Sequence, residues 1–166
     1  AYSKNKLMGM VQLKKENNSV YKIGCLGKIS DYQTSKDGRI LINLTGITRF
    51  KILDEITNDK LYREFEVSYK SFENDFAEKT SVTNTTNLMN KAKNFFERNG
   101  LLLNWKEFEK LDLAQKINTL AMISPVTNEE KQKLLETISL DEKIRILENI
   151  IDFYLHDVNF NNQTLQ

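Results

Sequence analysis

The stretch IGCLGKISDYQTSKDGRILINLTGITRFKI, Ile23–Ile52, decides the fold because it holds two strand-like segments separated by a turn signal. Asp37-Gly38 is typical of a type I′ hairpin turn, in which both central residues take positive φ. After this turn, Ile40–Ile52 alternates with period two, which predicts a strand with one face on a core. Gly46 interrupts that face and predicts a bulge or a sharp bend. The face would carry Ile40, Ile42, Leu44, Gly46, Thr48, Phe50 and Ile52.

The beginning of this stretch, GCLGKIS (Gly24–Ser30), looks like a phosphate-binding loop but lacks two of the required residues. In the pattern G-x-x-x-x-G-K-[ST], backbone N–H groups wrap a phosphate and the hydroxyl after the lysine reaches Mg²⁺. Counting from the Gly-Lys pair, the first glycine position holds Lys22 and the hydroxyl position holds Ile29. We therefore expect a strand at Val20–Ile29, with glycines where another part of the backbone comes close.

Two further segments before and after the hairpin also have the pattern of strands. Leu7–Leu13 is short and apolar, and Tyr62–Tyr69 alternates between apolar and polar residues. Together with the hairpin they predict a small twisted antiparallel sheet.

The second half of the chain carries the start and stop signals of helices. A capping residue followed three positions later by Glu or Gln can satisfy two backbone donors at a helix start. We expect helices over Thr86–Asn99, stopped by Gly100, over Leu113–Ile123, ahead of Pro125, and over Leu140–His156. The capping spacing occurs at Asn104 and Glu107, Asp112 and Gln115, Thr127 and Glu130, and Ser139 and Glu142.

These elements predict an α+β fold, with a β subdomain over residues 1–75 and a helical subdomain over residues 76–166. Within the second subdomain, the polar residues from about 157 to 166 are expected to form a tail. The last helix would turn an apolar stripe toward the core. That stripe consists of Ile144, Leu147, Ile151, Tyr154 and Leu155.

No motif in the sequence supports an enzyme active site, so we expect a non-enzymatic protein without a metal or cofactor. Cys25 is the only cysteine and His156 the only histidine, so neither a disulfide framework nor a zinc site is expected. The single cysteine suits a reducing cytosol, and no apolar run is long enough to span a membrane. Residues 1–53 hold ten Lys or Arg against three Asp or Glu, a balance that could attract nucleic acid.

Several short motifs, in this order along the chain, resemble one known family. They include MVQ at Met10–Gln12, GC.G.I and DGR..I.L.G..RF within Ile23–Ile52, and YR at Tyr62-Arg63. NW at Asn104-Trp105 and EKQ.LLE within Leu120–Glu136 follow in the helical half. The ordered set, over about residues 8–155, resembles the LON substrate-binding domain, the N-terminal domain of ATP-dependent Lon proteases that also occurs as stand-alone bacterial proteins.

This resemblance implies a PUA-like pseudo-barrel followed by a helical bundle. Family members usually begin with further strands and a helix before the segment that matches Met10–Gln12, so the resemblance implies a sheet whose N-terminal strands are missing here. No part of the sequence matches the ATPase or the Ser–Lys protease of full-length Lon. The resemblance therefore implies a recognition module that binds unfolded or tagged polypeptide, with a protease or chaperone system as a further partner.

The sequence leaves several functions in competition. The leading hypothesis is a protein-binding module that accepts an extended segment in an apolar groove or at a sheet edge. An RNA-binding module of the PUA-like kind is the main alternative, followed by an oligomer-forming module and a hydrolase. The candidate polypeptide-binding residues are Tyr32, Arg49, Tyr62 and Phe65, of which Arg49 and Tyr32 are expected to be exposed, whereas Phe50 is expected in the core.

Overall fold

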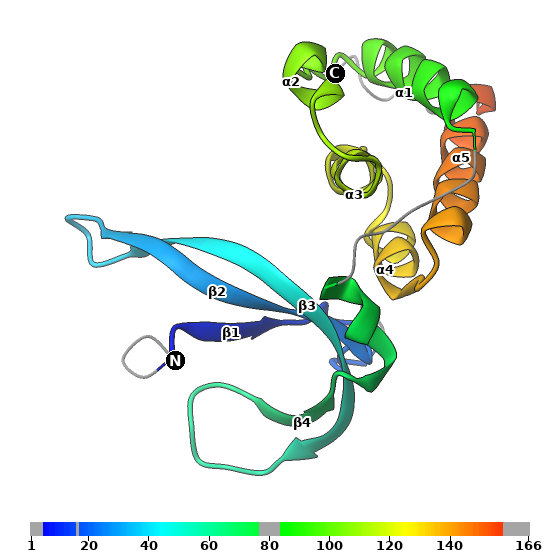
Figure 1. Cartoon of the computed structure of the whole chain (residues 1–166). Coiled ribbons are helices and arrows are strands. Elements are labelled where there is room, and N and C mark those ends of the chain that lie inside the picture. Colours follow the sequence, from blue (N-terminus) through cyan, green and yellow to red (C-terminus); the bar gives the residue numbers. More distant parts are fainter. Residues whose placement is uncertain (1–4, 16, 77–83, 158–166) are drawn as a thin grey trace. The chain divides into compact units, whose positions relative to one another are not determined.

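The computed structural model describes residues 5–15, 17–76 and 84–157. The chain divides into two compact units, Ala1–Glu78 and Lys79–Gln166. The described strands lie in the first, which we call the β unit, and the long helices lie in the second, the helical unit (Figure 1). Beyond Asp157, the expected polar tail lies outside the described residues.

The β unit contains a four-stranded sheet in the order β1-β2-β3-β4, and all neighbouring strands are antiparallel. The predicted α+β class, an antiparallel sheet followed by helices, is therefore confirmed. The two central strands run further than the alternation pattern predicted, and they form a hairpin that reaches past β1 (Figure 1). The strands are β1 (Leu7–Met10), β2 (Ile23–Thr34), β3 (Ile40–Ile56) and β4 (Glu64–Ser68).

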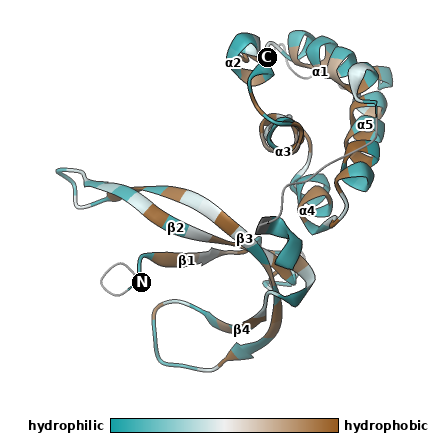
Figure 2. Ribbon diagram, viewed as in Figure 1, coloured by the Kyte–Doolittle hydropathy of each residue, from teal (hydrophilic) through white to brown (hydrophobic). Residues whose placement is uncertain are grey.

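The single apolar face predicted for β3 is wrong, because a β-bulge divides it. Leu26 pairs with Thr48, but its neighbour Gly27 pairs with Gly46, so Ile47 is an extra residue in β3. Adjacent residues of a strand point to opposite faces, so Gly46 and Thr48 lie on opposite faces of the sheet. The bulge expected at Gly46 is thus confirmed, and it moves the apolar residues of the outer hairpin to the face opposite Phe50. Figure 2 shows the resulting interleaving of apolar and polar residues along β2 and β3.

The hairpin turn also differs from the predicted type I′ geometry. Gly38 has a φ of 82°, but Asp37 is not among the residues with positive φ. The backbone N–H of Ser35 donates to the carbonyl of Arg39, and the N–H of Gly38 donates to the carbonyl of Ser35. These bonds close a three-residue loop with its last residue in the left-handed region, an arrangement that needs only one positive φ.

A short 3₁₀ segment, η1 (Lys70–Phe76), packs against β3 and buries Arg49, which was expected to be exposed. The Arg49 Nε donates to Asp75 Oδ2 at 2.9 Å and its Nη2 to Oδ1 at 2.7 Å, while its backbone N–H donates to Oδ2 at 3.1 Å. The guanidinium also lies 4.4 Å from the centroid of the Phe72 ring. This side chain is buried because its charge, donors and flat face are all matched by η1.

The helical unit contains the predicted helices with bounds that agree closely. Asn104, Asp112, Thr127 and Ser139 each accept a hydrogen bond from the backbone N–H three residues later, which confirms all four predicted caps. Reciprocal capping boxes form at Asp112 and at Thr127. The helices are α1 (Thr86–Arg98), α2 (Trp105–Glu109), α3 (Leu113–Ile123), α4 (Asn128–Glu136) and α5 (Leu140–His156).

The core of the helical unit is aromatic and aliphatic, and includes the predicted stripe of α5. Phe95 and Phe96 of α1 are each 1% exposed, and the Phe95 ring lies 5.9 Å from that of Tyr154. The Phe96 ring lies 6.0 Å from that of Trp105. Other members of this core, each no more than 1% exposed, are Leu88, Ala92, Ile117, Leu120, Leu134, Ile144, Leu147 and Ile151.

One hydrogen-bonded carboxylate joins the start of α4 to α5. Glu130 Oε2 accepts from the backbone N–H and the hydroxyl of Thr127 and from the hydroxyl of Tyr154, each at 2.8 Å. Burial, followed by this bond to Glu130, raises the pKa of Tyr154 to about 12. Since the folded state holds the phenol proton more tightly than the unfolded chain, the contribution of Tyr154 to stability is full below pH 10 and falls as the pH rises toward 12.

We therefore expect Tyr154→Phe to flatten the loss of stability between pH 10 and 12. Urea denaturation of both proteins at a series of pH values measures this difference. Because Phe cannot ionise, it removes the one titration that differs between the two proteins. Equal slopes in this interval would show that folding does not raise the pKa of Tyr154.

Candidate functional site

An apolar groove of about 310 Å³ runs over one face of the β unit and is the candidate functional site. We call it the sheet groove. Its walls come from all four strands and from the segments that flank them, so residues far apart in the sequence meet there. The apolar lining includes Val11, Val20, Leu26, Phe50, Phe65 and Val67.

Strand register explains why these side chains share one face. Leu26 pairs with Thr48, and Phe50 lies two positions further along the same face of β3. Ile52, two positions beyond Phe50, pairs with Val67 of β4. Because alternate residues of paired strands point the same way, Leu26, Phe50 and Val67 form a continuous apolar surface.

Two glycines give the groove its floor by letting the Phe50 ring lie against the backbone. A Cβ atom on Gly24 would be 2.6 Å from the ring and 2.6 Å from the carbonyl oxygen of Met10. A Cβ atom on Gly9 would be 3.3 Å from the same ring. Gly27 makes a similar close contact on the opposite face of the sheet, where a Cβ atom would be 2.5 Å from the Leu44 side chain. The glycines of GCLGKIS are therefore explained by close packing within the sheet, as the sequence predicted.

The rim of the groove contains aromatic rings and the guanidinium of Arg63, whose charge is paired with Glu55. The Tyr69 ring meets Phe50 edge to face at 6.5 Å and remains 40% exposed. The Arg63 guanidinium lies 5.1 Å from the Phe65 ring and donates two hydrogen bonds to Glu55, at 2.6 and 2.5 Å. These bonds lower the pKa of Glu55 and raise that of Arg63, so both groups stay charged at neutral pH and neither suits proton transfer.

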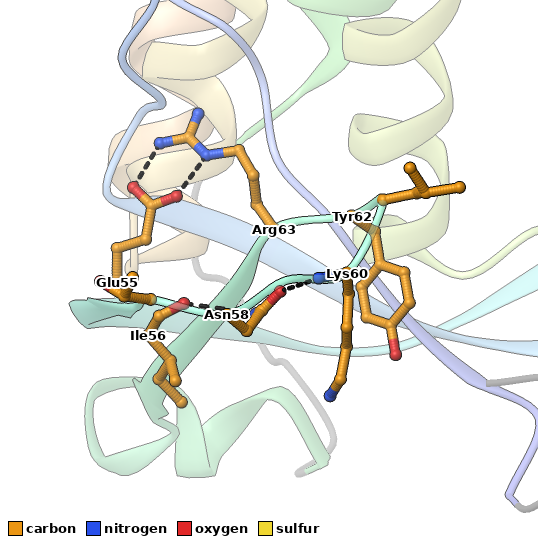
Figure 3. Close-up of a pocket in the computed structure, with 8 residues that line it drawn as sticks. Glu55, Ile56, Asn58, Lys60, Tyr62 and Arg63 are labelled. Atoms are coloured by element: carbon orange, nitrogen blue, oxygen red, sulfur yellow. Dashed lines mark hydrogen bonds and ion pairs between the residues drawn. The ribbon is translucent and has the colours of Figure 1, made fainter.

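A second hollow of about 400 Å³, which we call the loop pocket, lies in the connection between β3 and β4. Arg63 lines both the loop pocket and the sheet groove, and Figure 3 shows its paired bonds to Glu55 at one side of the pocket. The pocket is lined by Glu55, Ile56, Thr57, Asn58, Lys60, Leu61, Tyr62 and Arg63.

The polar groups of the loop pocket bond to one another and hold the loop together. The Asn58 side chain accepts from the backbone N–H of Lys60 at 2.8 Å and donates to Glu64 at 3.1 Å. The Lys60 ammonium donates to Glu64 at 2.5 Å, and this bond raises the pKa of Lys60. The lysine also lies 5.5 Å from the Tyr62 ring. With its charges already paired, this pocket is a weaker candidate for a ligand site than the sheet groove.

The structure places the four predicted site residues in different surroundings. Phe65 lines the sheet groove and Tyr62, which is 59% exposed, lines the loop pocket. Tyr32 is 45% exposed, as expected, but pairs with Ile42 on the face opposite the groove. Arg49 is only 6% exposed beneath η1. Phe50, expected in the core, is 4% exposed and also forms the groove floor.

Sequence reasoning missed Val67 and Tyr69 as groove residues. The signal for them was present, because Phe65, Val67 and Tyr69 occupy alternate positions in a predicted strand. What the sequence could not supply was the register that sets this alternation beside Leu26 and Phe50.

Neither a reactive cysteine nor a metal-binding cluster is found among the described residues. Burial, followed by the nearby Asp75 carboxylate, raises the pKa of Cys25, so this half-buried residue stays a thiol at neutral pH. Among residues 5–15, 17–76 and 84–157, no group of His, Cys, Asp or Glu is arranged to hold a metal ion. No helix in that part of the chain is both long enough and apolar enough to cross a membrane.

Comparisons with known proteins identify one family and solved structures with a similar fold. The family model described as the ATP-dependent protease La (LON) substrate-binding domain matches residues 1–152. A comparison with curated protein sequences gave no match.

The first similar structure is the crystal structure of a Lon N-terminal domain protein from Xanthomonas campestris, with a TM-score of 0.55, 16% identity and coverage of 89% of each chain. The second is the N-terminal domain of Mycobacterium avium complex Lon protease, with a TM-score of 0.52 and 17% identity, covering 87% of this chain and 77% of that one. At sequence identities this low, the two structures show that the fold is similar and nothing further.

Proposed function

The chain belongs to the LON substrate-binding domain family, and from this premise we propose that it is a non-catalytic module that binds extended apolar segments of unfolded or tagged polypeptide. Such a module would deliver its clients to a protease or chaperone system in the cytoplasm. The proposal assigns binding to the β unit and no bond-breaking step to either unit.

The observation that carries this proposal is the sheet groove. An exposed apolar hollow on a protein surface is costly in water, because each apolar area left uncovered forgoes the free energy of burial. Here the floor is the Phe50 ring and the walls include Phe65 and Val67. Aromatic and aliphatic contacts of this kind accept many sequences, since burial depends on apolar area and not on the order of hydrogen-bonding groups.

The geometry of the groove favours an extended client over a folded one. It follows a sheet face about four strands wide, where alternate side chains of an extended segment can enter an apolar hollow. Tyr69 adds an amphipathic rim, with its ring on Phe50 and a hydroxyl that can reach a client backbone.

The charge at the groove fits polypeptide better than RNA. Arg63 is the cation that lines it, and its guanidinium is already engaged by Glu55. Binding of RNA depends on cations that neutralise phosphates and release counterions, which gives a steep dependence on salt. Binding by apolar burial should lose much less affinity as salt is raised.

A fluorescence-anisotropy titration of the whole chain tests the proposal. The probes are a permanently unfolded polypeptide and a short RNA, each titrated at low and at moderate salt. We expect saturable binding of the polypeptide that tolerates salt. Phe65→Ala should weaken it about tenfold, which corresponds to about 1.4 kcal/mol, because truncation removes apolar area from the groove wall.

Phe153→Ala is the matched control, because it makes the same truncation at a side chain of the helical unit that is 62% exposed. It should leave the affinity unchanged. Equal losses in the two variants would remove the groove as the binding site. Binding of RNA alone, collapsing at moderate salt, would replace the proposal with the RNA-binding alternative.

A further inference from the structure

The C-terminal end of α1 carries the only Asn-Gly pair of the sequence, Asn99-Gly100. The pair lies where the chain leaves α1 on its way to α2 (Figure 1). Asparagine is especially prone to lose its side-chain amide when glycine follows, because glycine has no Cβ atom to keep its backbone nitrogen away from the asparagine side chain. Gly100 is exposed, and within the described residues only its chain neighbours lie within 4 Å of the place where a Cβ atom would be.

The reaction at such a pair needs the two residues and water. The backbone nitrogen of Gly100 would attack Cγ of Asn99, so that a new C–N bond forms and the C–NH₂ bond breaks. The amide leaves as ammonia and takes the proton that the backbone nitrogen loses. Water then opens the cyclic imide at either carbonyl group. The product is aspartate or isoaspartate, and in isoaspartate the main chain runs through the former side chain.

Hydrogen bonds keep both reacting groups in other contacts while α1 is intact. The side-chain amide of Asn99 donates to the carbonyl of Phe95 at 2.8 Å, which directs it back along the helix. The backbone N–H of Gly100 donates to the carbonyl of Glu97 at 3.1 Å, which opposes loss of its proton. Gly100 has a φ of 63°, the left-handed conformation in which helices commonly end with bonds of this kind. The folded helix end therefore protects the pair from reaction.

Unwinding of the last turn of α1 would release both groups together, because both acceptor carbonyls belong to that turn. Helix ends open more often than core segments, since fewer contacts are lost when they do. Asn99 is half-buried and Gly100 is exposed. Arg98, which donates from this turn to the carbonyl of Leu155 at 3.0 Å, is itself exposed. The pair thus lies in a segment that can open without unfolding of the whole helical unit.

We propose that Asn99 is a deamidation site that the folded end of α1 protects, and that its conversion to aspartate or isoaspartate weakens that helix end. Each opening of the last turn exposes the pair to reaction for a short time. The rate of conversion is therefore the rate in the unfolded chain multiplied by the fraction of time that the turn is open. The modified form accumulates with the age of the protein.

The product would weaken the cap in which it forms. A carboxylate at position 99 cannot donate to the carbonyl of Phe95, and its charge lies where the helix dipole is also negative. Isoaspartate adds a methylene group to the main chain, which displaces the N–H groups of Gly100 and Leu101 from the carbonyls of Glu97 and Phe96. Since the side chains of Phe95 and Phe96 are buried in the core, the change would lower the stability of the helical unit.

Peptide mapping by mass spectrometry tests the first part of the inference on the full chain, incubated in neutral buffer with and without a concentration of urea that unfolds it. The readout is the gain in mass when a carboxyl group replaces the amide of Asn99. We expect conversion in the folded chain to be about tenfold to a thousandfold slower than in the unfolded chain. Asn90, which is exposed in the middle of α1 and precedes Lys91, is the internal comparison and should stay intact in the folded chain.

Either extreme of this measurement would overturn the inference. Equal rates in the two conditions would mean that the helix end gives no protection. An Asn99 that remains unchanged in the folded chain, long after the unfolded chain has been converted, would mean that the last turn does not open. Conversion of Asn90 at the same rate as Asn99 would mean that the Asn-Gly pair is not the reactive feature.

Asn99→Asp tests the second part, because it introduces one of the two products directly. We expect this variant to lower the folding equilibrium constant of the helical unit about fivefold, through the lost hydrogen bond and the unfavourable charge. Urea denaturation followed by the helical signal in circular dichroism measures this change. Asn90→Asp is the matched control, since it adds the same charge to an exposed position in the middle of the same helix.

The control should leave the folding equilibrium nearly unchanged. Equal effects of Asn99→Asp and Asn90→Asp, or no effect of either, would show that conversion of Asn99 does not weaken the end of α1. Neither measurement uses a polypeptide probe, so both outcomes are independent of the proposed function.

Discussion

Asp75→Ala is expected to lower the free energy of unfolding of the β unit by about 3–5 kcal/mol, the range found when one partner of a buried ion pair is removed. The side chain of Arg49 is 7% exposed and that of Asp75 is 11% exposed. Without the carboxylate, the guanidinium and the backbone N–H of Arg49 lose the three hydrogen bonds that Asp75 accepts. The charge must then stay buried without its paired carboxylate or move out and uncover Phe72.

Hydrogen exchange of peptides from β3 and η1, measured across a urea series, reports this loss within the β unit. Glu55→Ala is the matched control, because it removes the carboxylate from another paired arginine, Arg63, whose side chain is 44% exposed. Water and salt replace a partner at an exposed site, so this control should have little effect on stability. Equal losses in the two variants would mean that burial of Arg49 does not make its ion pair essential.

Arg49 also shows where prediction from the sequence reached its limit. Its position in an alternating strand placed it on the polar side, and exposure followed from that reasoning. Burial depended on Asp75 and Phe72, which lie more than twenty residues later in a segment without strand periodicity. A long-range partner of this kind leaves no local signal, because neither the carboxylate nor the ring has a fixed spacing from the arginine.

The helices were predicted more accurately because their boundaries are set by local chemistry. An N-cap and its partner lie three residues apart, so Asp112 with Gln115 and Thr127 with Glu130 are visible in the sequence itself. Strand faces depend instead on register. The bulge at Ile47 could be suspected from Gly46, but its consequence, the transfer of the outer apolar residues to the other face, required the pairing with Gly27.

The candidate site combines both cases. Phe65 was a candidate binding residue in the sequence and lines the sheet groove, whereas the role of Gly9 and Gly24 depends on where the Phe50 ring lies. Glycine in a strand indicates a close approach without saying of what. Only some residues of a groove that is built from four strands can therefore be predicted from the sequence, because the others depend on the strand register.

The second large effect is expected in the helical unit, where Phe95→Ala should reduce the free energy of unfolding by about 3–5 kcal/mol. Phe95 is 1% exposed and lies 6.2 Å from Phe96 and 5.9 Å from Tyr154, measured between ring centroids. Truncation would remove the apolar transfer energy of the ring and leave a cavity between α1 and α5. Residues with fixed helical backbones on both sides can collapse into that space only in part.

The single tryptophan provides a local reporter for this prediction. Trp105 belongs to the helical unit and its ring lies 6.0 Å from that of Phe96, so its fluorescence follows unfolding of that unit in urea. Phe153→Ala, at a neighbouring α5 position that is 62% exposed, removes the same atoms from a side chain largely in water and should shift the midpoint little. If Phe95→Ala were no more destabilising than this control, α1 could not be held to α5 by aromatic packing. Polar contacts would then hold these helices together, including the bonds of the Lys91 ammonium to Glu148 at 2.9 Å and to Asp152 at 2.7 Å. Asn87 also donates to Glu148, and Arg98 donates to the carbonyl of Leu155.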